Sequence, residues 1–198
     1  MAAVRIAIII IIIIGDLILS AVSEECKPAH PALVIDTMVR FVRPCEYDVL
    51  LNDITEDDLH LIAEMDGMSY LGMSPITMPE FPVDGTIIGG HKRFMVNLLV
   101  RRRRAREYRN VVFMVDTGSP YTFLSRSAME AVTGSGADNL PAALKLEIHG
   151  NQSMVCYMSP PDKHFADINL LGTDFLELNG AQIHVDWAQR TFLLDSKN

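Results

Sequence analysis

Cysteine is scarce in this sequence, with three in 198 residues. Cys26 and Cys45 lie in the first quarter of the chain, and Cys156 lies far downstream. If the body of the chain is exported, a Cys26–Cys45 disulfide can form and Cys156 stays free, because disulfides persist in oxidising compartments. Three unpaired thiols are the alternative. Apolar residues make up 49% of the chain, which is enough for a hydrophobic core.

An excess of positive charge is missing as well, because the formal net charge is −8. This balance argues against a nucleic-acid partner for the whole molecule. His149, His164 and His184 lie on separate expected elements without the spacing of metal ligands. We therefore expect no metal and no cofactor, and we interpret the three histidines as ordinary turn or surface residues. Internal repeats are also missing, which excludes a solenoid.

A long apolar run is present at the N-terminus. Arg5 precedes residues 6–22, a mainly apolar run that Gly15-Asp16 interrupts in the middle. This layout is typical of a secretory signal peptide over residues 1–23, with small residues before the expected cleavage point. An uncleaved membrane anchor through residues 6–22 is the alternative, since 17 residues are the lower limit for a spanning helix.

Both interpretations of the apolar run predict export of the rest of the chain. Arg5 before the run and Glu24-Glu25 after it favour this orientation. We therefore expect a protein of the secretory pathway, either membrane-anchored or secreted. The sequon at Asn151 is then a candidate glycosylation site.

Charge divides the middle of the chain into two segments. Residues 24–90 carry thirteen acidic and three basic residues, whereas residues 91–110 carry eight basic and one acidic. The acidic N-terminal extension over residues 24–90 could be a pro-segment that covers the basic segment, or a linker. Within it, Thr55 as N-cap and apolar residues at helical spacing predict a short helix over residues 53–65.

Residues 91–198 have the texture of a mostly β domain. Short apolar or alternating runs separated by turn residues predict strands. The expected strands cover residues 94–100, 111–115, 144–148, 154–158, 168–171, 182–186 and 190–194. Two short helices are expected over residues 125–132 and 173–178.

Asp116 stands out because it follows the buried strand expected at residues 111–115. Burying a carboxylate at the end of such a strand costs desolvation free energy, which suggests a functional role for Asp116. Gly118 permits a tight turn after it, and Thr117 can both donate a hydrogen bond and pack. Two carboxylates at close range share a proton, and together they provide the base and the acid that activate a water for peptide hydrolysis.

Two motifs give the chain its resemblance to a known family. The first is Val115-Asp116-Thr117-Gly118-Ser119, followed by Tyr-Thr-Phe-Leu-Ser, and the second is Leu170-Leu171-Gly172-Thr173-Asp174-Phe175-Leu176. Gly172 follows Asp116 by 56 positions. In this order and at this spacing, the motifs resemble those of the retropepsin-like aspartic proteases of retroviruses and retrotransposons. The resemblance covers roughly residues 91–194.

The resemblance implies a closed, β-barrel-like acid protease subunit over residues 91–198, with one or two short helices. Asp116 would be the catalytic residue, and Thr117, Gly118 and Ser119 would support the catalytic loop, with Ser119 near the carboxylates. The second motif would cross behind this loop. Its supporting residues would be Leu170, Leu171, Gly172 and Asp174, of which Asp174 has a structural role at the start of a helix.

The chain contains one Asp-Thr-Gly loop, so the second carboxylate is expected from a second copy of the chain. The predicted protein is therefore a homodimeric aspartic endopeptidase with a protein or peptide substrate. A catalytically inactive module that only dimerises or binds peptides is the alternative. The flap that covers the site in this family matches poorly here, and its candidates are residues 133–143, the hairpin over residues 144–158 and residues 87–90.

Overall fold

The computed structural model describes residues 42–51, 53–76, 78–136, 139–150 and 153–196. The chain divides into two units, Met1–Cys45 and Glu46–Asn198, and the account below concerns the second. The apolar run at residues 6–22, Cys26 and Asn151 lie outside the described residues. Within those residues, no helix has the length and apolar character needed to cross a membrane.

Helices in the described residues are few and short. They are the 3₁₀ turn η1 (Pro44–Glu46), α2 (Glu56–Met65), α3 (Arg126–Thr133) and α4 (Thr173–Leu178). The strands are β1 (Met73–Ser74), β2 (Val83–Ile88), β3 (Arg93–Arg102), β4 (Tyr108–Val115), β5 (Phe123–Leu124), β6 (Ala143–Ile148), β7 (Ser153–Met158), β8 (Leu170–Leu171), β9 (Gln182–Asp186) and β10 (Thr191–Asp195).

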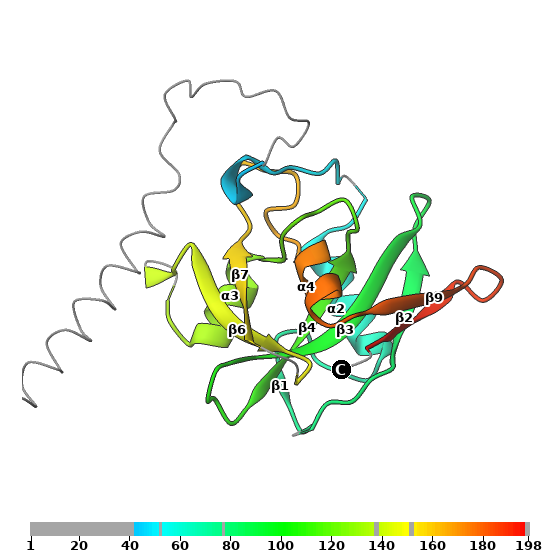
Figure 1. Cartoon of the computed structure of the whole chain (residues 1–198), viewed down its shortest axis with the longest axis horizontal. Helices are drawn as coiled ribbons and strands as arrows, with labels where there is room; N and C mark the ends of the chain where they lie inside the picture. Colours follow the sequence, from blue (N-terminus) through cyan, green and yellow to red (C-terminus); the bar gives the residue numbers. More distant parts are fainter. Residues whose placement is uncertain (1–41, 52, 77, 137–138, 151–152, 197–198) are drawn as a thin grey trace, which may run out of the picture. The chain divides into compact units, whose positions relative to one another are not determined.

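The strands join into one sheet that closes on itself. Their order is β1-β4-β8-β5-β7-β6-β3-β2-β10-β9, and an additional pairing joins β4 to β3 (Figure 1). The pairing closes β4, β8, β5, β7, β6 and β3 into a ring, while β2, β10 and β9 extend the sheet from β3. The prediction of a mostly β, barrel-like fold with two short helices after residue 91 is therefore confirmed.

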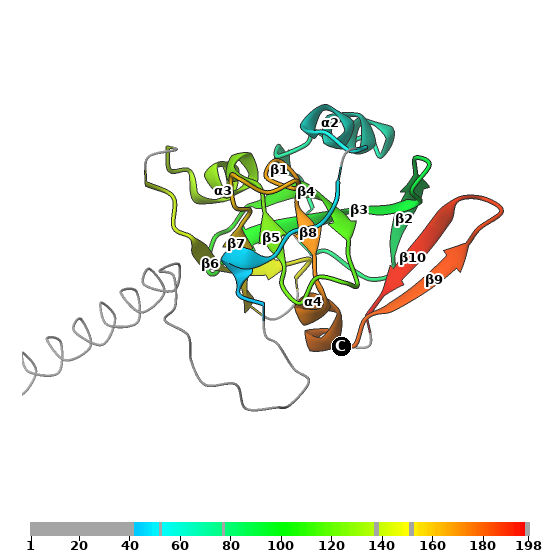
Figure 2. The ribbon, with the colours of Figure 1, turned by 90° about the horizontal axis from the view of Figure 1, so that it is seen from above.

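Two apolar clusters lie on opposite faces of the β3–β4 hairpin. Successive side chains of a strand point to opposite faces, so Val111 and Phe113 join one cluster while Val112 and Met114 join the other. The first cluster also contains residues of α3 and α4, and the second contains residues of α2. Figure 2 shows α2 and α4 on opposite sides of the sheet. The unbroken apolar run at residues 111–115 of β4 fits this burial on both faces.

Residues 46–90 are part of the same compact unit as residues 91–198. β2 pairs with β3 on one side and with β10 on the other. The expected domain start at residue 91 therefore falls in the turn between two paired strands. The acidic and basic segments also contact each other through an ion pair, in which the Asp53 carboxylate lies 3.1 Å from the Arg93 guanidinium.

The predicted helices begin at the predicted caps. The Thr55 hydroxyl accepts the Asp58 N–H, and the Asp58 carboxylate accepts the Thr55 N–H, which is a complete capping box for α2. α3 begins after Ser125, whose hydroxyl accepts the Ala128 N–H at 3.2 Å. These local hydrogen bonds explain why the sequence pattern was sufficient to locate both helix starts.

Candidate active site

The buried strand β4 delivers Asp116 to the edge of the sheet. β4 pairs in parallel with β8, with Met114 opposite Leu170 and Val115 opposite Leu171. The pairing continues one residue further, because the Asp116 N–H donates to the Leu171 carbonyl at 3.0 Å. The backbone of Asp116 is thus fixed by the second motif, while its side chain remains partly exposed.

The loop after β4 is closed by its own hydrogen bonds. The Gly118 N–H donates to Asp116 Oδ1 at 2.9 Å, and the Ser119 N–H donates to the Asp116 carbonyl at 3.1 Å. A Cβ atom at position 118 would lie 3.2 Å from Asp116 Oδ1, so glycine allows the close approach of its N–H. Thr117 and Gly118 are exposed at the apex, and Ser119 is buried.

Ser119 fastens this loop to the start of α4. Its hydroxyl donates to the Tyr121 carbonyl at 2.6 Å. Its carbonyl accepts two hydrogen bonds from Thr173, from the N–H at 2.8 Å and from the hydroxyl at 3.0 Å. A backbone carbonyl needs a partner when it is buried, and the second motif supplies it.

Asp174, in the first turn of α4, is hydrogen-bonded to Thr122 in the segment that follows the Asp116 loop. Its carboxylate accepts the Thr122 hydroxyl at 2.6 Å and the Thr122 N–H at 3.0 Å, and the Gly172 N–H donates to the Thr122 hydroxyl at 3.1 Å. Burial raises the pKa of Asp174, and the hydrogen bonds from Thr122 and Phe175 oppose that rise. Asp174 lies in the first turn of α4, as predicted.

Tyr47 is a site residue that sequence reasoning missed. Its hydroxyl donates to Asp116 Oδ2 at 2.8 Å, across 69 positions of sequence. Burial, followed by the hydrogen bond to Asp116, raises the pKa of the Tyr47 phenol. No motif surrounds Tyr47, and the only local signal is a tyrosine among polar and apolar residues before α2.

Aromatic rings surround the Asp116–Tyr47 contact. The Tyr47 ring stacks on Phe123 with centroids 5.8 Å apart and meets Phe165 edge-on at the same distance. Tyr121 meets both Phe123 and Tyr157 edge-on. Phe123 and Phe165 are fully buried. The chain after the Asp116 loop therefore returns to the core at this cluster.

The hairpin over residues 144–158, one of the three flap candidates, does not form a flap in this subunit. β6 pairs with β3, and β7 pairs with β5, so the hairpin is part of the closed ring. The turn of this hairpin lies at Leu99, because the His149 N–H donates to the Leu99 carbonyl. Leu99 pairs with Asn110 near the start of β4, whereas Asp116 follows the end of β4. Six residues of strand separate these points, which is roughly 20 Å.

The other flap candidates differ in place and form. Residues 133–143 contain no strand before β6 in the part that the structure describes. The turn after residues 87–88 connects β2 to β3 at Gly89-Gly90. Because Met95 of β3 pairs with Met114 of β4, this turn lies toward the Asp116 end of the hairpin.

His149 lies in a turn, as one of the two interpretations expected, but it is buried and so is not a surface residue. Its Nδ1 accepts the Leu99 N–H at 3.5 Å, and its Nε2 lies 2.9 Å from the Glu80 carbonyl. Burial lowers the pKa of His149. The neutral ring therefore bridges β3 and the segment before β2. His164 and His184 are exposed, as expected.

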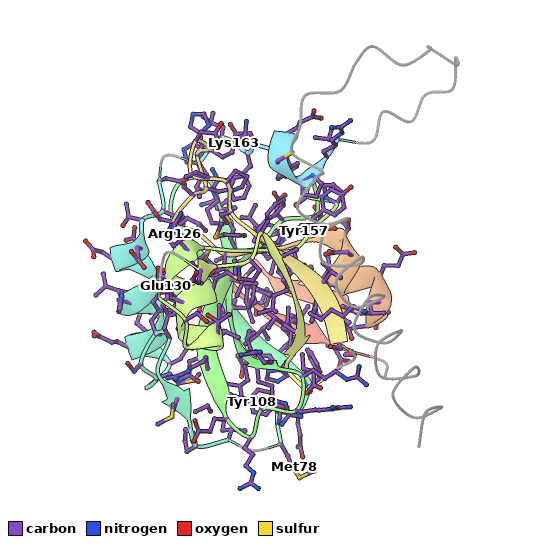
Figure 3. All side chains as sticks on the ribbon, turned by 90° about the vertical axis from the view of Figure 1, so that its left-hand side faces the viewer. Met78, Tyr108, Arg126, Glu130, Tyr157 and Lys163 are labelled. Carbon is purple, nitrogen blue, oxygen red and sulfur yellow. The ribbon has the colours of Figure 1, made fainter. Side chains whose placement is uncertain are left out.

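The arginine-rich turn lies at the far end of the β3–β4 hairpin from Asp116. Arg101 pairs with Glu147 at 2.7 Å and stacks over the Tyr108 ring at 4.4 Å. Figure 3 shows Tyr108 toward one end of the unit and Tyr157, from the aromatic cluster near Asp116, toward the other. The basic turn is therefore not part of the candidate site.

Comparison with solved structures finds chains that are similar to this one. No family model and no curated protein matches the chain. The crystal structure of a retropepsin-like aspartic protease from Rickettsia conorii is similar to it, with 19% sequence identity and a TM-score of 0.40. The match covers 63% of this chain and 97% of the other. Membership of the family stays a prediction.

The described residues offer no group of three or more potential metal ligands among histidine, cysteine, aspartate and glutamate. In the same residues, the hydrogen bonds recorded to the Asp116 carboxylate come from Gly118 and Tyr47. Asp174 is engaged with Thr122, on the inner side of the loop. The arrangement thus presents one carboxylate at a rigid, outward-facing loop.

Proposed function

We propose that the protein is an aspartic endopeptidase in which Asp116 from each of two chains forms the catalytic pair. The observation that carries the proposal is the place of Asp116, on a loop whose apex is exposed and whose base is hydrogen-bonded to the second motif. An exposed apex at Thr117 and Gly118 leaves room for the same loop of a second copy, related by a two-fold axis.

The proposed reaction uses the two carboxyl groups in opposite protonation states. The ionised Asp116 takes a proton from a water while the water oxygen attacks the peptide carbonyl, and the protonated Asp116 of the other chain donates to the carbonyl oxygen. A proton then passes to the nitrogen as the carbon–nitrogen bond breaks, giving a carboxylic acid and an amine. The partners are a second copy and a protein or peptide substrate.

Replacement of Asp116 tests this function. We expect Asp116→Asn to reduce peptide-bond cleavage by a factor of at least about 1,000, because an amide cannot take the proton. Cleavage of a mixed peptide library, followed by mass spectrometry at acidic and neutral pH, measures the loss. Asp84→Asn is the matched control, since Asp84 is exposed on β2 and its flanking residues lack the Asp-Thr-Gly order.

Mixing wild-type and Asp116→Asn chains tests the shared site. If both carboxylates are needed, only dimers of two wild-type chains are active, and activity falls with the square of the wild-type fraction. A linear fall means that one chain suffices and contradicts the shared pair. A wild-type protein that forms dimers but cleaves no peptide supports the inactive module instead.

We propose export for the same protein, with the segment over residues 6–22 as a signal or a membrane anchor. The charge difference across the apolar run supports this location. Fractionation of expressing cells, with protease protection of the intact compartments, measures it. Recovery of the chain in the cytosol would contradict export.

A further inference from the structure

The segment before α2 holds a phenol against the proposed catalytic carboxylate. We call residues 46–51 the latch segment. Tyr47 donates to Asp116 Oδ2 at 2.8 Å, and Gly118 donates to Oδ1 of the same carboxylate at 2.9 Å. Both carboxylate oxygens therefore already accept a hydrogen bond within one chain.

The latch segment is attached to the unit at several points beyond this hydrogen bond. The Tyr47 ring stacks on Phe123, and Asp48 accepts hydrogen bonds from the His164 N–H at 3.1 Å and from its Nδ1 at 3.0 Å. The Leu50 carbonyl accepts from the Arg93 guanidinium at 3.0 Å, and Leu51 is 5% exposed. The segment is thus docked as part of the structure.

The contact interferes with both requirements of the proposed reaction. A nucleophilic water and the second carboxyl group must each come within hydrogen-bond distance of the Asp116 oxygens. The Tyr47 hydroxyl occupies Oδ2 at that distance, and its ring packs beside it against Phe123 and Phe165. Access for water, substrate or a second Asp116 therefore requires movement of the Tyr47 side chain.

Tyr47 is suited to block the carboxylate rather than to take part in proton transfer. Burial and the neighbouring Asp116 raise the pKa of its phenol, so the hydroxyl stays a donor at acidic and neutral pH. A donor that never loses its proton cannot serve as a base. Its bond to an ionised carboxylate is charge-assisted, which makes it stronger than a bond between neutral groups.

We propose that the latch segment is an internal inhibitor, with the Tyr47 hydroxyl as the group that blocks Asp116. The inference rests on the proposed function, because it concerns access to the same carboxylate. Substrate binding or pairing with a second copy must displace Tyr47 before the site can act. The Tyr47 ring anchors the segment on Phe123, and its hydroxyl is hydrogen-bonded to the carboxylate.

Tyr47→Phe tests the proposal in the full chain. The substitution keeps the aromatic ring on Phe123 and removes only the hydroxyl. We expect peptide cleavage at low substrate concentration to rise about tenfold or more, because the lost bond is a charge-assisted hydrogen bond to the carboxylate that water and substrate need. Tyr108→Phe is the matched control, because it removes the same group at the opposite end of β4.

A binding measurement tests whether Tyr47 blocks access to Asp116 independently of peptide cleavage. The probe is a peptide with a secondary alcohol in place of the cleaved carbonyl, titrated by calorimetry. Its hydroxyl needs the same carboxylate, so Tyr47→Phe should bind it about tenfold more tightly than the wild type, and Tyr108→Phe should not. Equal affinity in all three proteins would overturn the latch even if all three cleave peptides.

Asp48→Ala provides a second variant that leaves Tyr47 and Asp116 intact. It removes the attachment to His164, so the latch predicts a smaller rise in cleavage and in probe affinity. Loss of activity in Tyr47→Phe would assign Tyr47 to positioning Asp116 and would overturn inhibition. If neither the wild type nor any variant cleaves peptides or binds the probe, both the proposed function and the inhibition by the latch segment are contradicted. If Tyr47→Phe cleaves peptides at the wild-type rate, only the inhibition is contradicted.

Discussion

At the scale of single residues, Gly172 is the place where the two motifs approach most closely. A Cβ atom there would lie 2.2 Å from the Tyr121 carbonyl oxygen and 2.4 Å from its carbon, and both are backbone atoms that cannot rotate away. We expect Gly172→Ala to destabilise the unit by about 2 kcal/mol or more, because the loop and β8 must separate. Urea unfolding followed by circular dichroism measures the change.

Gly90→Ala is the control for that substitution. Nothing lies within 4 Å of a Cβ atom built at Gly90, so we expect a change of less than about 0.5 kcal/mol. Equal stability of the two variants would show that the backbone approach at Gly172 is dispensable. Loss of peptide cleavage in Gly172→Ala without loss of stability would place its effect on the Asp116 loop instead.

At the scale of elements, the pairing of β2 with β10 depends on a fit between Gly85 and Phe192. These residues are opposite one another, and a Cβ atom at Gly85 would lie 2.2 Å from the Phe192 ring. We expect Gly85→Ala alone to cost about 1–3 kcal/mol. With Phe192→Leu present, the added cost should be smaller, giving a coupling of about 0.5–3 kcal/mol in a double-mutant cycle.

A second double-mutant cycle, with Leu193 in place of Phe192, is the control for the contact between Gly85 and Phe192. Leu193 is the next residue of β10 and is 40% exposed. Gly85→Ala and Leu193→Ala should therefore add within about 0.5 kcal/mol, since they do not share the packed ring. Strong coupling in this second cycle would mean that the β10 backbone shifts as a whole.

At the scale of the whole molecule, the second compact unit covers Glu46–Asn198 and so includes residues 46–90. A chain that starts at Glu46 keeps β2 and α2, which bury apolar residues against both β3 and β4. We expect it to unfold cooperatively with a dispersed amide spectrum. A chain that starts at His91 should lose cooperative unfolding, because the second apolar cluster would face water without α2.

The chain that starts at His91 also tests the hypothesis that residues 24–90 are a pro-segment. If the chain from His91 folds and cleaves peptides as well as the longer one, residues 46–90 are a removable extension. If it fails to fold while the longer chain folds, the latch segment cannot be released by cutting at residue 91. Near-ultraviolet circular dichroism and urea titrations distinguish these results.

Local signals were sufficient where a short stretch of sequence completes its own hydrogen bonds. The capping box at Thr55 and the N-cap at Ser125 predicted both helix starts, and alternating or apolar runs predicted β3, β4, β6, β7, β9 and β10. β2 was missed, because Gly85 and Asp84 weaken its strand pattern. Its place depends on β3, β10 and the ring of Phe192 instead.

By itself, the sequence determined the mostly β character and the buried strand before Asp116, which follow from local periodicity and turn chemistry. The family resemblance implied that the second motif crosses behind the Asp116 loop. Only the tertiary structure placed Tyr47 on Asp116, buried His149 and joined residues 46–90 to the sheet. Those contacts join residues tens of positions apart, and their energy comes from packing and hydrogen bonds that no local pattern encodes.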